Sequence, residues 1–258
     1  MAKSQRASRS THLWSLVSWW RVRVRQRRME RLAQAFHFTP QTRILDVGGT
    51  PDLWRLANLP GRLVIVNLGY DAWMARQAGF CTVVADGCQL PFRNGSFDLV
   101  FSNSVIEHLG TAERQKQFAR EIARVGKGYF VETPNRWFPL EQHLMTPLLH
   151  WLPRRWQQWV APRFNLWACI ERPTPDRREH YVQHYLQAIR LLDARSLRRL
   201  FPDSHIMRER WLGLTKALIA IRSPTASGAN EPRSESAGSQ ACEEERSFPA
   251  QQDPRTRG

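Results

Sequence analysis

ILDVGGTPDLW, residues 44–54, is the stretch that decides the fold of this chain. An apolar run ends at Asp46, a glycine pair follows, and Thr50 and Pro51 are residue types that begin helices, as N-cap and as first helical residue. The segment therefore predicts a strand, a tight turn and a helix. In open α/β sheets, ligands bind in the crevice beyond the carboxyl end of such a strand, so this turn marks a candidate binding edge.

The same alternation of strands and helices continues along the chain. After the first strand, residues 43–47, we expect strands at residues 63–68, 82–85, 97–102, 129–132, 205–211 and 216–221, and helices at residues 51–58, 71–78, 111–124 and 194–201. The last two strands suggest an antiparallel hairpin. Together these elements predict an α/β fold, a doubly wound, mostly parallel seven-stranded Rossmann-like sheet with helices on both faces.

A segment rich in Trp and Pro, residues 134–185, interrupts this rhythm after the fifth strand. It holds only short apolar helical stretches, such as residues 145–152, and we interpret it as an insertion or lid over the carboxyl edge of the sheet. Part of it has the composition of a membrane interface, although the same residues suit the packing of a lid. These residues are Trp151, Arg154, Arg155, Trp156 and Trp159.

The two ends of the chain differ from its central domain, residues 40–222. Residues 1–39 read as a basic tail and an amphipathic helix; the alternation in residues 21–25 also permits a strand, but no turn signal bounds it. The helix has two interpretations, a flap packed over the domain or a helix lying on an anionic membrane surface. Residues 223–258 have almost no aliphatic side chains and predict a disordered tail.

The net charge of +15 suits an anionic partner, which leaves a phospholipid surface, a nucleic acid or an anionic small substrate. The four cysteines lack the paired spacing of a zinc site and are too sparse for a disulfide framework, so we expect no metal and a reducing compartment. No apolar run is long enough to span a membrane, and LWSLVSWW leads into arginines instead of a cleavage site. We expect a cytoplasmic protein, with peripheral attachment at the inner face of a membrane as the alternative.

Polar residues follow the first three strands and should meet at one crevice: Asp46, the stretch from Asn67 to Asp71, and Asp86. A dinucleotide site would need the spacing G-x-G-x-x-G at the first turn. Residues 48–51, Gly-Gly-Thr-Pro, lack that spacing, and the proline removes a backbone donor. The turn therefore disfavours a nicotinamide or flavin dinucleotide.

Four segments, in this order and spacing, resemble the class I S-adenosylmethionine (SAM)-dependent methyltransferases of the type 11 branch. They are ILDVGGTP (44–51), ADGCQLPF (85–92), SFDLVFSNSVIEHL (96–109) and GKGYFVETPN (126–135). With the final helix and strands, the resemblance covers residues 40–222. It implies a methyltransferase with SAM as its cofactor.

The resemblance also implies a cofactor site. Asp46 would anchor the turn and, with Gly48 and Gly49, face the methionine part of SAM, where small residues let the backbone approach closely. The family places an acid for the ribose at the end of the second strand; this chain has Asn67 there, so the ribose contact falls to Asn67 or Asp71.

For the adenine, the resemblance implies a hydrogen bond from its amino group to Asp86, with Gly87 and Cys88 beside the ring. Ser102 and Asn103 would border the reactive methyl group. An aspartate at a strand end is also often a simple loop or helix cap, and this alternative stands beside each of these roles.

Methyl transfer is an in-line displacement, so positioning supplies much of the rate and a base is needed only when the acceptor keeps a proton. The candidate bases are His108, Glu107 and His143, and a purely structural histidine is the alternative at His108. Substrate-binding candidates lie in the insertion, and the alternative is that they only hold the insertion in place; they are Asn135, Arg136, Glu141 and His143.

We therefore expect methyl transfer to an oxygen or carbon of a small acceptor or of a lipid-linked or glycan-linked one. A non-catalytic, weakly SAM-binding, membrane-associated protein is one alternative, since the usual second-strand acid is missing. A nucleic-acid-directed methyltransferase is the other, and it is disfavoured because the chain has no recognition-module signature.

Overall fold

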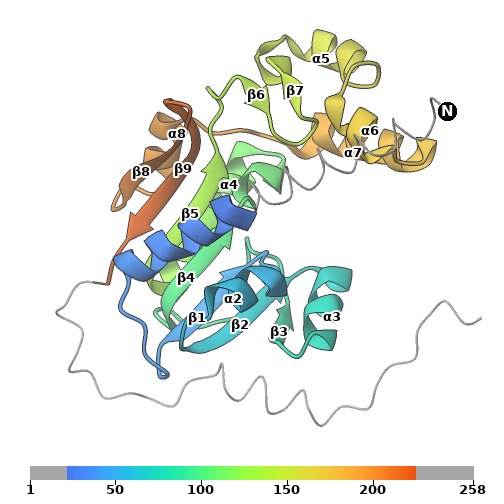
Figure 1. Cartoon of the computed structure of the whole chain (residues 1–258). Coiled ribbons are helices and arrows are strands. Elements are labelled where there is room, and N and C mark those ends of the chain that lie inside the picture. The colour runs from blue at the N-terminus through green and yellow to red at the C-terminus, as the bar shows by residue number, and fades with distance from the viewer. Residues whose placement is uncertain (1–21, 225–258) are drawn as a thin grey trace, which may run out of the picture.

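A computed structural model of the chain describes residues 22–224 (Figure 1). Its centre is a seven-stranded sheet in the order β3-β2-β1-β4-β5-β9-β8. The first five strands run parallel, and β9 and then β8 continue the sheet antiparallel. The strands are β1 (Arg43–Val47), β2 (Arg62–Asn67), β3 (Cys81–Val84), β4 (Phe97–Asn103), β5 (Gly126–Pro134), β8 (His205–Trp211) and β9 (Leu214–Arg222). The predicted fold class and the closing hairpin are confirmed.

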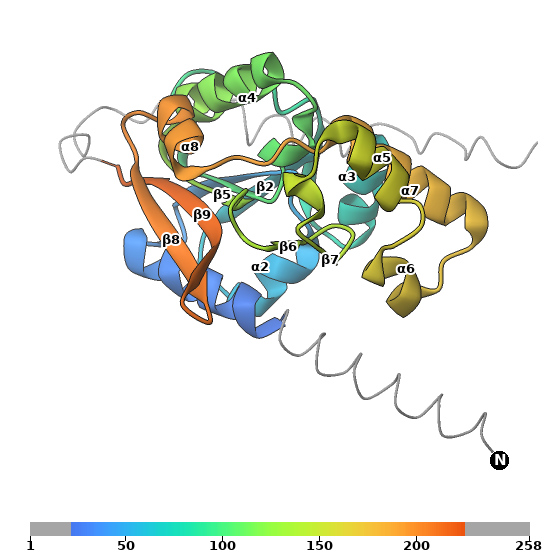
Figure 2. The same cartoon turned by 90° about the horizontal axis from the view of Figure 1, so that it is seen from above.

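Helices cover both faces of the sheet (Figure 2). On one face, α4 (Ala112–Val125) and α8 (Ala194–Leu200) bury Phe118, Ile122 and Leu197 against the strands. On the other face, α2 (Pro51–Ala57) packs beside the N-terminal helix, whose described part spans residues 22–35. The remaining helix of the alternating pattern, α3 (Gly69–Gln77), packs against β2 and β3 at the sheet edge. These are the two layers that a doubly wound sheet needs to bury its strands.

The N-terminal helix is part of the core. Met29, Leu32 and Phe36 are buried against Phe101 and Phe130 of the sheet. Residues 22–25 are helical, so the strand alternative for this stretch is wrong, and the flap interpretation agrees with the packing of residues 22–36. Residues 1–21, which include the first half of the predicted amphipathic helix, and residues 225–258 of the predicted disordered tail lie outside the described chain.

The ends of the helices follow local sequence signals, with one exception. Thr111 caps α4 by accepting a hydrogen bond from Arg114 N, and Asp193 caps α8 by accepting one from Ser196 N. Thr50 occupies the N-cap of α2 and Pro51 its first position, but the Thr50 side chain makes no capping bond. The residue types at this turn were therefore correct, while the expected N-cap bond is absent.

The insertion is more helical than its sequence indicated. It contains the small hairpin of β6 (Leu140–Glu141) and β7 (Thr146–Pro147), a 3-10 turn η2 (Leu149–Trp151), and the helices α5 (Arg154–Val160), α6 (Leu166–Glu171) and α7 (Pro175–Ala188). The expected helical stretch at residues 145–152 is instead strand and 3-10 turn, because Met145 and Leu148 adopt positive φ. The fourteen-residue α7 was missed, although Thr174 caps it and Pro175 begins it.

The insertion has its own small core and lies beyond the carboxyl edge of the sheet. Leu144, Leu149, Val182, Tyr185 and Leu186 form this core. The segment leaves the sheet at the end of β5 and stands above the strands in Figure 1. Its last helix, α7, contacts the 3-10 turn η1 (Ile106–Leu109) that follows β4. It is thus placed where the sequence expected a lid. None of the helices in residues 22–224 combines the length and apolar character needed to cross a bilayer.

Candidate functional site

The turn after β1 is shaped by two glycines. Gly48 has φ +78°, a conformation that other residues rarely adopt. A Cβ on Gly49 would lie 1.6 Å from Asp46 Oδ2, so only glycine leaves room for this carboxylate. The turn thus brings backbone close to Asp46 at the carboxyl edge of the sheet.

Asp46 is fully buried beneath this turn. Its Oδ2 accepts a hydrogen bond of 2.6 Å from Trp54 Nε1, and within residues 22–224 its Oδ1 has no hydrogen-bond partner. Burial raises the pKa of Asp46 to about 7, against the smaller opposing effect of the Trp54 bond. An unpartnered buried carboxylate oxygen is uncommon and indicates a site for a donor group. Trp54 was not singled out from the sequence, although it lies one helical turn into α2.

The two ribose candidates differ in position. Asn67 lies at the end of β2 and donates from Nδ2 to the carbonyl oxygen of Gly49 at 2.8 Å, so it braces the glycine turn. Asp71 lies in the first turn of α3 with an exposed side chain. Of the two, the structure brings only Asn67 into contact with the turn.

Asp86 follows β3 and is held by two neighbours. Cys88 N donates to Oδ1 at 2.9 Å, and Arg114 donates to Oδ1 and Oδ2 at 3.1 and 2.8 Å. Burial opposes ionisation, but these hydrogen bonds outweigh it and hold the pKa of Asp86 below its usual value. Gly87 leaves no room for a side chain, since a Cβ there would lie 2.8 Å from the Phe118 ring. Arg114, on α4, was missed because no local pattern marks it.

The residues predicted to border the methyl group have structural partners. Ser102 is fully buried and donates from Oγ to the carbonyl oxygen of Val47 at 3.0 Å, which ties β4 to the end of β1. Asn103 accepts through Oδ1 a hydrogen bond from Arg28 of the N-terminal helix. Ser102 is therefore a strand tie, and Asn103 belongs to a buried polar cluster.

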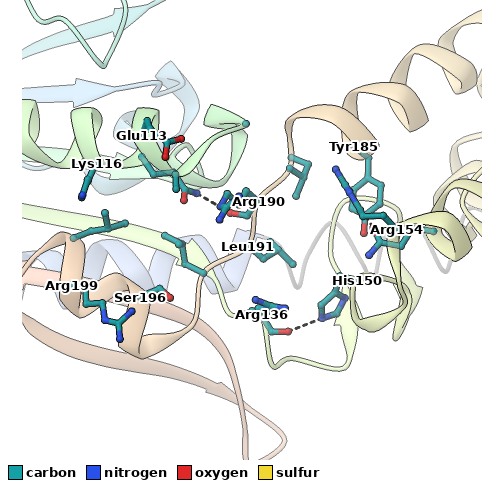
Figure 3. A pocket seen from close by; sticks show the side chains of 17 residues that line it. Glu113, Lys116, Arg136, His150, Arg154, Tyr185, Arg190, Leu191, Ser196 and Arg199 are labelled. Carbon is teal, nitrogen blue, oxygen red and sulfur yellow. Dashed lines mark hydrogen bonds between the residues drawn. The ribbon is translucent and has the colours of Figure 1, made fainter.

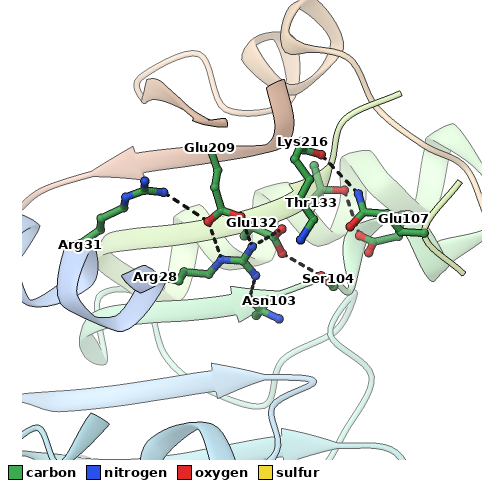
Figure 4. Close-up of polar contacts among 10 residues, drawn as sticks. Arg28, Arg31, Asn103, Ser104, Glu107, Glu132, Thr133, Glu209 and Lys216 are labelled. Atoms are coloured by element: carbon green, nitrogen blue, oxygen red, sulfur yellow. Dashed lines mark hydrogen bonds and ion pairs between the residues drawn. The ribbon is translucent and has the colours of Figure 1, made fainter. Parts of the chain in front are cut away.

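This ionic cluster joins the N-terminal helix to β5 and β8 (Figure 4). Arg28 lies 2.9 Å from Glu132 Oε1 and 2.9 Å from Glu209 Oε1, and all three side chains are almost fully buried. Arg31 adds a second contact to Glu209 at 3.3 Å, and Ser104 Oγ donates to Glu132 Oε2 at 2.7 Å. Burial works against the charge of Arg28, but the two carboxylates outweigh it and raise the pKa of Arg28. None of these ion pairs was predicted, since the partners are far apart in the sequence.

A second polar cluster lies at the end of β4 and contains the predicted bases. Glu107 is fully buried; its Oε2 accepts a hydrogen bond of 2.9 Å from Thr133 Oγ1, and its Oε1 has no hydrogen-bond partner in the described chain. Burial and the nearby Glu132 carboxylate raise the pKa of Glu107 to about 7. His108 Nε2 lies 4.0 Å from Glu107 Oε1, and the His108 and His143 rings are 5.0 Å apart between centroids.

The pKa values of the two histidines in this cluster are shifted in opposite directions. Burial, followed by the neighbouring His143 and His184, lowers the pKa of His108 to about 4, so it is neutral at pH 7. Burial also acts on His143, but its 2.7 Å hydrogen bond to Glu141 Oε1 and the charge of Glu141 outweigh it and raise the pKa. Of the two, His143 is the stronger base, and His108 is an uncharged imidazole.

The remaining substrate candidates are tied into the fold. Glu141 accepts three hydrogen bonds, from the ring and backbone of His143 and from Leu144 N. Asn135 donates from Nδ2 to Thr215 O at 2.8 Å and accepts from Trp137 N at 3.3 Å. The Arg136 carbonyl accepts a hydrogen bond from Trp151 Nε1. These contacts agree with the alternative that the residues hold the insertion in place, except that the Arg136 side chain lines a cavity.

That cavity, of about 590 Å³, opens between α4, α8, the chain before α8 and the insertion (Figure 3). Five cationic side chains line it with one acidic side chain, Glu113. The cations are Lys116, Arg136, Arg154, Arg190 and Arg199. None of the predicted cofactor residues lines it, so the cavity is separate from the glycine turn. Its charge suits an anionic group.

The tryptophans of the insertion divide into two sets. Trp151 packs against Trp137 and donates to the Arg136 carbonyl, as expected of a lid residue. Trp156 and Trp159 are 55% and 51% exposed, and Arg163 lies over the Trp159 ring. Trp137 and Trp151 are also exposed, at 61% and 45%, so the four tryptophans together retain the composition of an interface.

Residues 55–130 match a family model described as a methyltransferase domain, beginning just after the glycine turn. A segment of 52 residues is 42% identical to the mouse (Mus musculus) protein Probable tRNA methyltransferase 9B; the match covers 20% of this chain and only 12% of that protein's length.

Among solved structures, one with a TM-score above 0.5 supports the likeness in fold, and a second is given for comparison. A Rhodobacter sphaeroides protein named among the Zn-dependent alcohol dehydrogenases has a TM-score of 0.51 at 12% identity, covering 74% of this chain and 87% of its own. A SAM-dependent methyltransferase from Archaeoglobus fulgidus has a TM-score of 0.48 at 13% identity, covering 78% and 94%. Residues 55–130 are thus similar to the methyltransferase domain family, and the sheet that contains them has the Rossmann-like fold that the sequence predicted.

Proposed function

We propose that this protein is a SAM-dependent methyltransferase that methylates an oxygen or carbon of a small acceptor or of a lipid-linked or glycan-linked one. The observation that supports this most directly is Asp46, buried under a turn that admits only glycine, with one carboxylate oxygen unpartnered in the described chain. A cationic ammonium group, such as the one on the methionine part of SAM, would satisfy this oxygen and stabilise the charged carboxylate.

The residues at the sheet edge fit SAM in part. Asp46, Gly48 and Gly49 would hold the methionine part, and Asn67 would offer its amide to the ribose while bracing the turn. Asp86 would take the adenine amino group, but both of its oxygens now hold Arg114, so this guanidinium would have to release one of them. Arg114 is half-exposed and therefore has room to turn away.

SAM supplies an electrophilic methyl group on a positively charged sulfur, so the chain itself needs to orient the acceptor and, for a protonated acceptor, to remove one proton. His143 is the better candidate for this base because Glu141 orients its ring and raises its pKa. His108, uncharged at pH 7, would accept a hydrogen bond or a proton only weakly.

The acceptor would enter beneath the insertion. The cation-lined cavity next to α7 and α8 suits an acidic or phosphate-bearing part of the acceptor. Exposed Trp156 and Trp159 support peripheral attachment to the inner face of a membrane, at which lipid-linked acceptors would be available. A cytoplasmic protein acting on a soluble acceptor would use the same cavity.

A nucleic-acid acceptor is the second candidate, because the mouse protein matched over 52 residues is named a tRNA methyltransferase. In that case the basic cavity would bind phosphates, and binding would weaken steeply with salt. The non-catalytic alternative predicts weak SAM binding or none, and the Asn67 at the end of β2 is the feature that favours it.

Two measurements test the proposal. Calorimetry should show SAM binding to the wild-type chain and none to Asp46→Ala, whose fold is checked by circular dichroism. Asp52→Ala is the matched control, since Asp52 is an exposed acid on the neighbouring turn of α2 and should bind SAM as the wild type does. Equal affinity in Asp46→Ala would contradict the role of the turn.

The acceptor class follows from incubating the protein with methyl-labelled SAM and a cell extract, then separating the lipid, glycan, small-molecule, protein and nucleic-acid fractions. Label in the lipid, glycan or small-molecule fraction is the expected result. Label found only in the nucleic-acid fraction would contradict the proposed acceptor class and support a nucleic-acid acceptor instead.

A further inference from the structure

Three ligand-bearing side chains converge at the end of β4. The Glu107 carboxylate and the imidazoles of His108 and His143 each place one oxygen or nitrogen atom within 4.8 Å of the other two. Two of these residues come from η1 and the third from the β6–β7 hairpin. We propose that Glu107, His108 and His143 bind a divalent transition-metal ion, with coordination positions left open for oxygen ligands.

The orientation of His143 fits such a role. Its Nδ1 lies 2.7 Å from Glu141 Oε1, and because the carboxylate can only accept, Nδ1 is the protonated nitrogen. The lone pair of Nε2 is then directed to the other side of the ring. A histidine that donates to a carboxylate through one nitrogen and binds through the other is the usual arrangement around protein-bound metals.

His108 is oriented in a similar way. Its Nδ1 lies 3.3 Å from His184 Nε2 of α7, and the two rings are stacked. With the proton on Nδ1 and donated to His184, the Nε2 lone pair faces Glu107 Oε1 at 4.0 Å. That distance is too long for a hydrogen bond, so the two atoms are neighbours without being partners.

The independent observation is the unpartnered carboxylate oxygen. Glu107 is fully buried, and Thr133 satisfies its Oε2, whereas Oε1 finds no hydrogen-bond donor in residues 22–224 and lies 4.0 Å from His108 Nε2. A buried charged oxygen without a partner is destabilising. A metal ion in this position would remove that penalty.

The ligand set narrows the kind of ion. Two imidazoles and one carboxylate suit Zn²⁺, Mn²⁺ or Fe²⁺, whereas Mg²⁺ and Ca²⁺ prefer oxygen ligands throughout. At bond lengths of about 2.0–2.2 Å, the three atoms would have to close in by less than about 1 Å each. The expectation of no metal rested on the cysteines, while these ligands are a Glu-His pair and a histidine 35 residues further along the chain.

The position of the cluster suggests what the ion does. It lies where β4 and β5 end, between η1 and the β6–β7 hairpin of the insertion, under which we place the acceptor. An ion there would bind an acceptor oxygen and lower its pKa, which makes a hydroxyl a better nucleophile. With His143 bound to the ion, the ion would replace this histidine as the group that activates the acceptor. This use of the ion rests on the proposed methyltransferase function, but the binding of the ion itself does not.

The test uses the full chain without a histidine tag, stripped with a chelator and titrated with Co²⁺ as a spectroscopic substitute for Zn²⁺. We expect one Co²⁺ per chain, with visible absorption bands and no near-ultraviolet sulfur-to-cobalt band, since no cysteine is involved. Glu107→Gln and His143→Gln should each weaken binding at least tenfold. His205→Gln, an exposed histidine at the start of β8, should bind as the wild type does.

The outcomes separate the metal site from the methyltransferase function. Circular dichroism first establishes that each variant is folded. No Co²⁺ binding to the folded wild type, or equal affinity in all variants, would overturn the metal site even if the stripped protein binds SAM. Co²⁺ binding with the expected variant pattern, in a protein that fails to bind SAM, would support the site and overturn the proposed function alone.

Discussion

The glycine turn after β1 and the ionic cluster at the ends of β5 and β8 are both buried and both polar, yet they are built by different means. The turn depends on residues that are neighbours in sequence, since a side chain at Gly49 would occupy the space of the Asp46 carboxylate. The cluster depends on Arg28 and Glu209, which are 181 positions apart. Steric requirements of the first kind are visible in a sequence, and electrostatic pairing of the second kind is not.

The largest effect is expected from Gly49→Ala. The added Cβ would lie 1.6 Å from Oδ2 of the buried Asp46, so the carboxylate would have to move and give up its hydrogen bond from Trp54. We expect a loss of about 4 kcal/mol or more in the free energy of unfolding, measured by urea denaturation.

Gly79→Ala is the matched control for this change. Gly79 has positive φ, which Gly49 does not, and a Cβ there would meet nothing within 4 Å, so Gly79→Ala should cost only backbone strain of about 1–2 kcal/mol. If both variants lose the same stability, the contact between the added Cβ and the Asp46 carboxylate costs no more than backbone strain, and the carboxylate does not define the turn.

A somewhat smaller effect is expected from Arg28→Met in the ionic cluster. Removing the guanidinium leaves Glu132 and Glu209 buried without their main cationic partner, at a cost of about 3 kcal/mol. The triple variant with Glu132→Gln and Glu209→Gln should recover much of this loss. No recovery in urea denaturation would mean that Arg28 acts through packing and not through charge.

The pH dependence of stability tests the environment of Asp46. In the folded chain the pKa of Asp46 is about 7, whereas in the unfolded chain it is near the ordinary aspartate value of 3.8. The folded state therefore binds more protons between these values, and this residue makes stability fall as pH rises. Asp46→Asn keeps an acceptor for Trp54 and removes the titration, so between pH 5 and pH 7 it should gain about 2 kcal/mol relative to the wild type.

Urea denaturation at the two pH values provides the measurement. A constant difference between Asp46→Asn and the wild type would show that the Asp46 carboxylate is not titrating in this range.

The smallest effects distinguish two helix starts of the same residue type. Thr111→Ala removes a side-chain cap from α4 and should cost about 1 kcal/mol, while Thr50→Ala removes no capping bond from α2 and should cost less than about 0.5 kcal/mol. Thermal unfolding of the two variants gives the difference. An equal loss would show that Thr50 supports the glycine turn in some other way.

Most of the sheet could be predicted because each strand is an apolar run bounded by its own turn residues. The seven strands, the closing hairpin and the helices α2, α3, α4 and α8 were all indicated by such local patterns. In contrast, α7 was missed because its composition resembles the surrounding loops, even though Thr174 and Pro175 mark its start.

The candidate site was predictable only as a list of residues at strand ends. The hydrogen-bond partner of each polar residue is set by contacts across the fold: Trp54 donates to Asp46, Arg114 to Asp86, and Arg28 to Asn103. These pairings could not be predicted from sequence periodicity, because each hydrogen bond joins two elements with no fixed separation in the chain. Glu107 was recognised as a possible base, but its unpartnered oxygen becomes visible only when His108 and His143 are placed around it.

The position of β9 has a consequence for biosynthesis. This strand is the last in the described chain, yet it lies between β5 and β8 and pairs with β5 from Tyr129 to Pro134. Until residues 214–222 leave the ribosome, the apolar strand β5 has an open edge available to other nascent chains. A premature stop before residue 214 would thus be expected to yield an aggregating product, even though every residue of the glycine turn and of the metal-ligand cluster is already present.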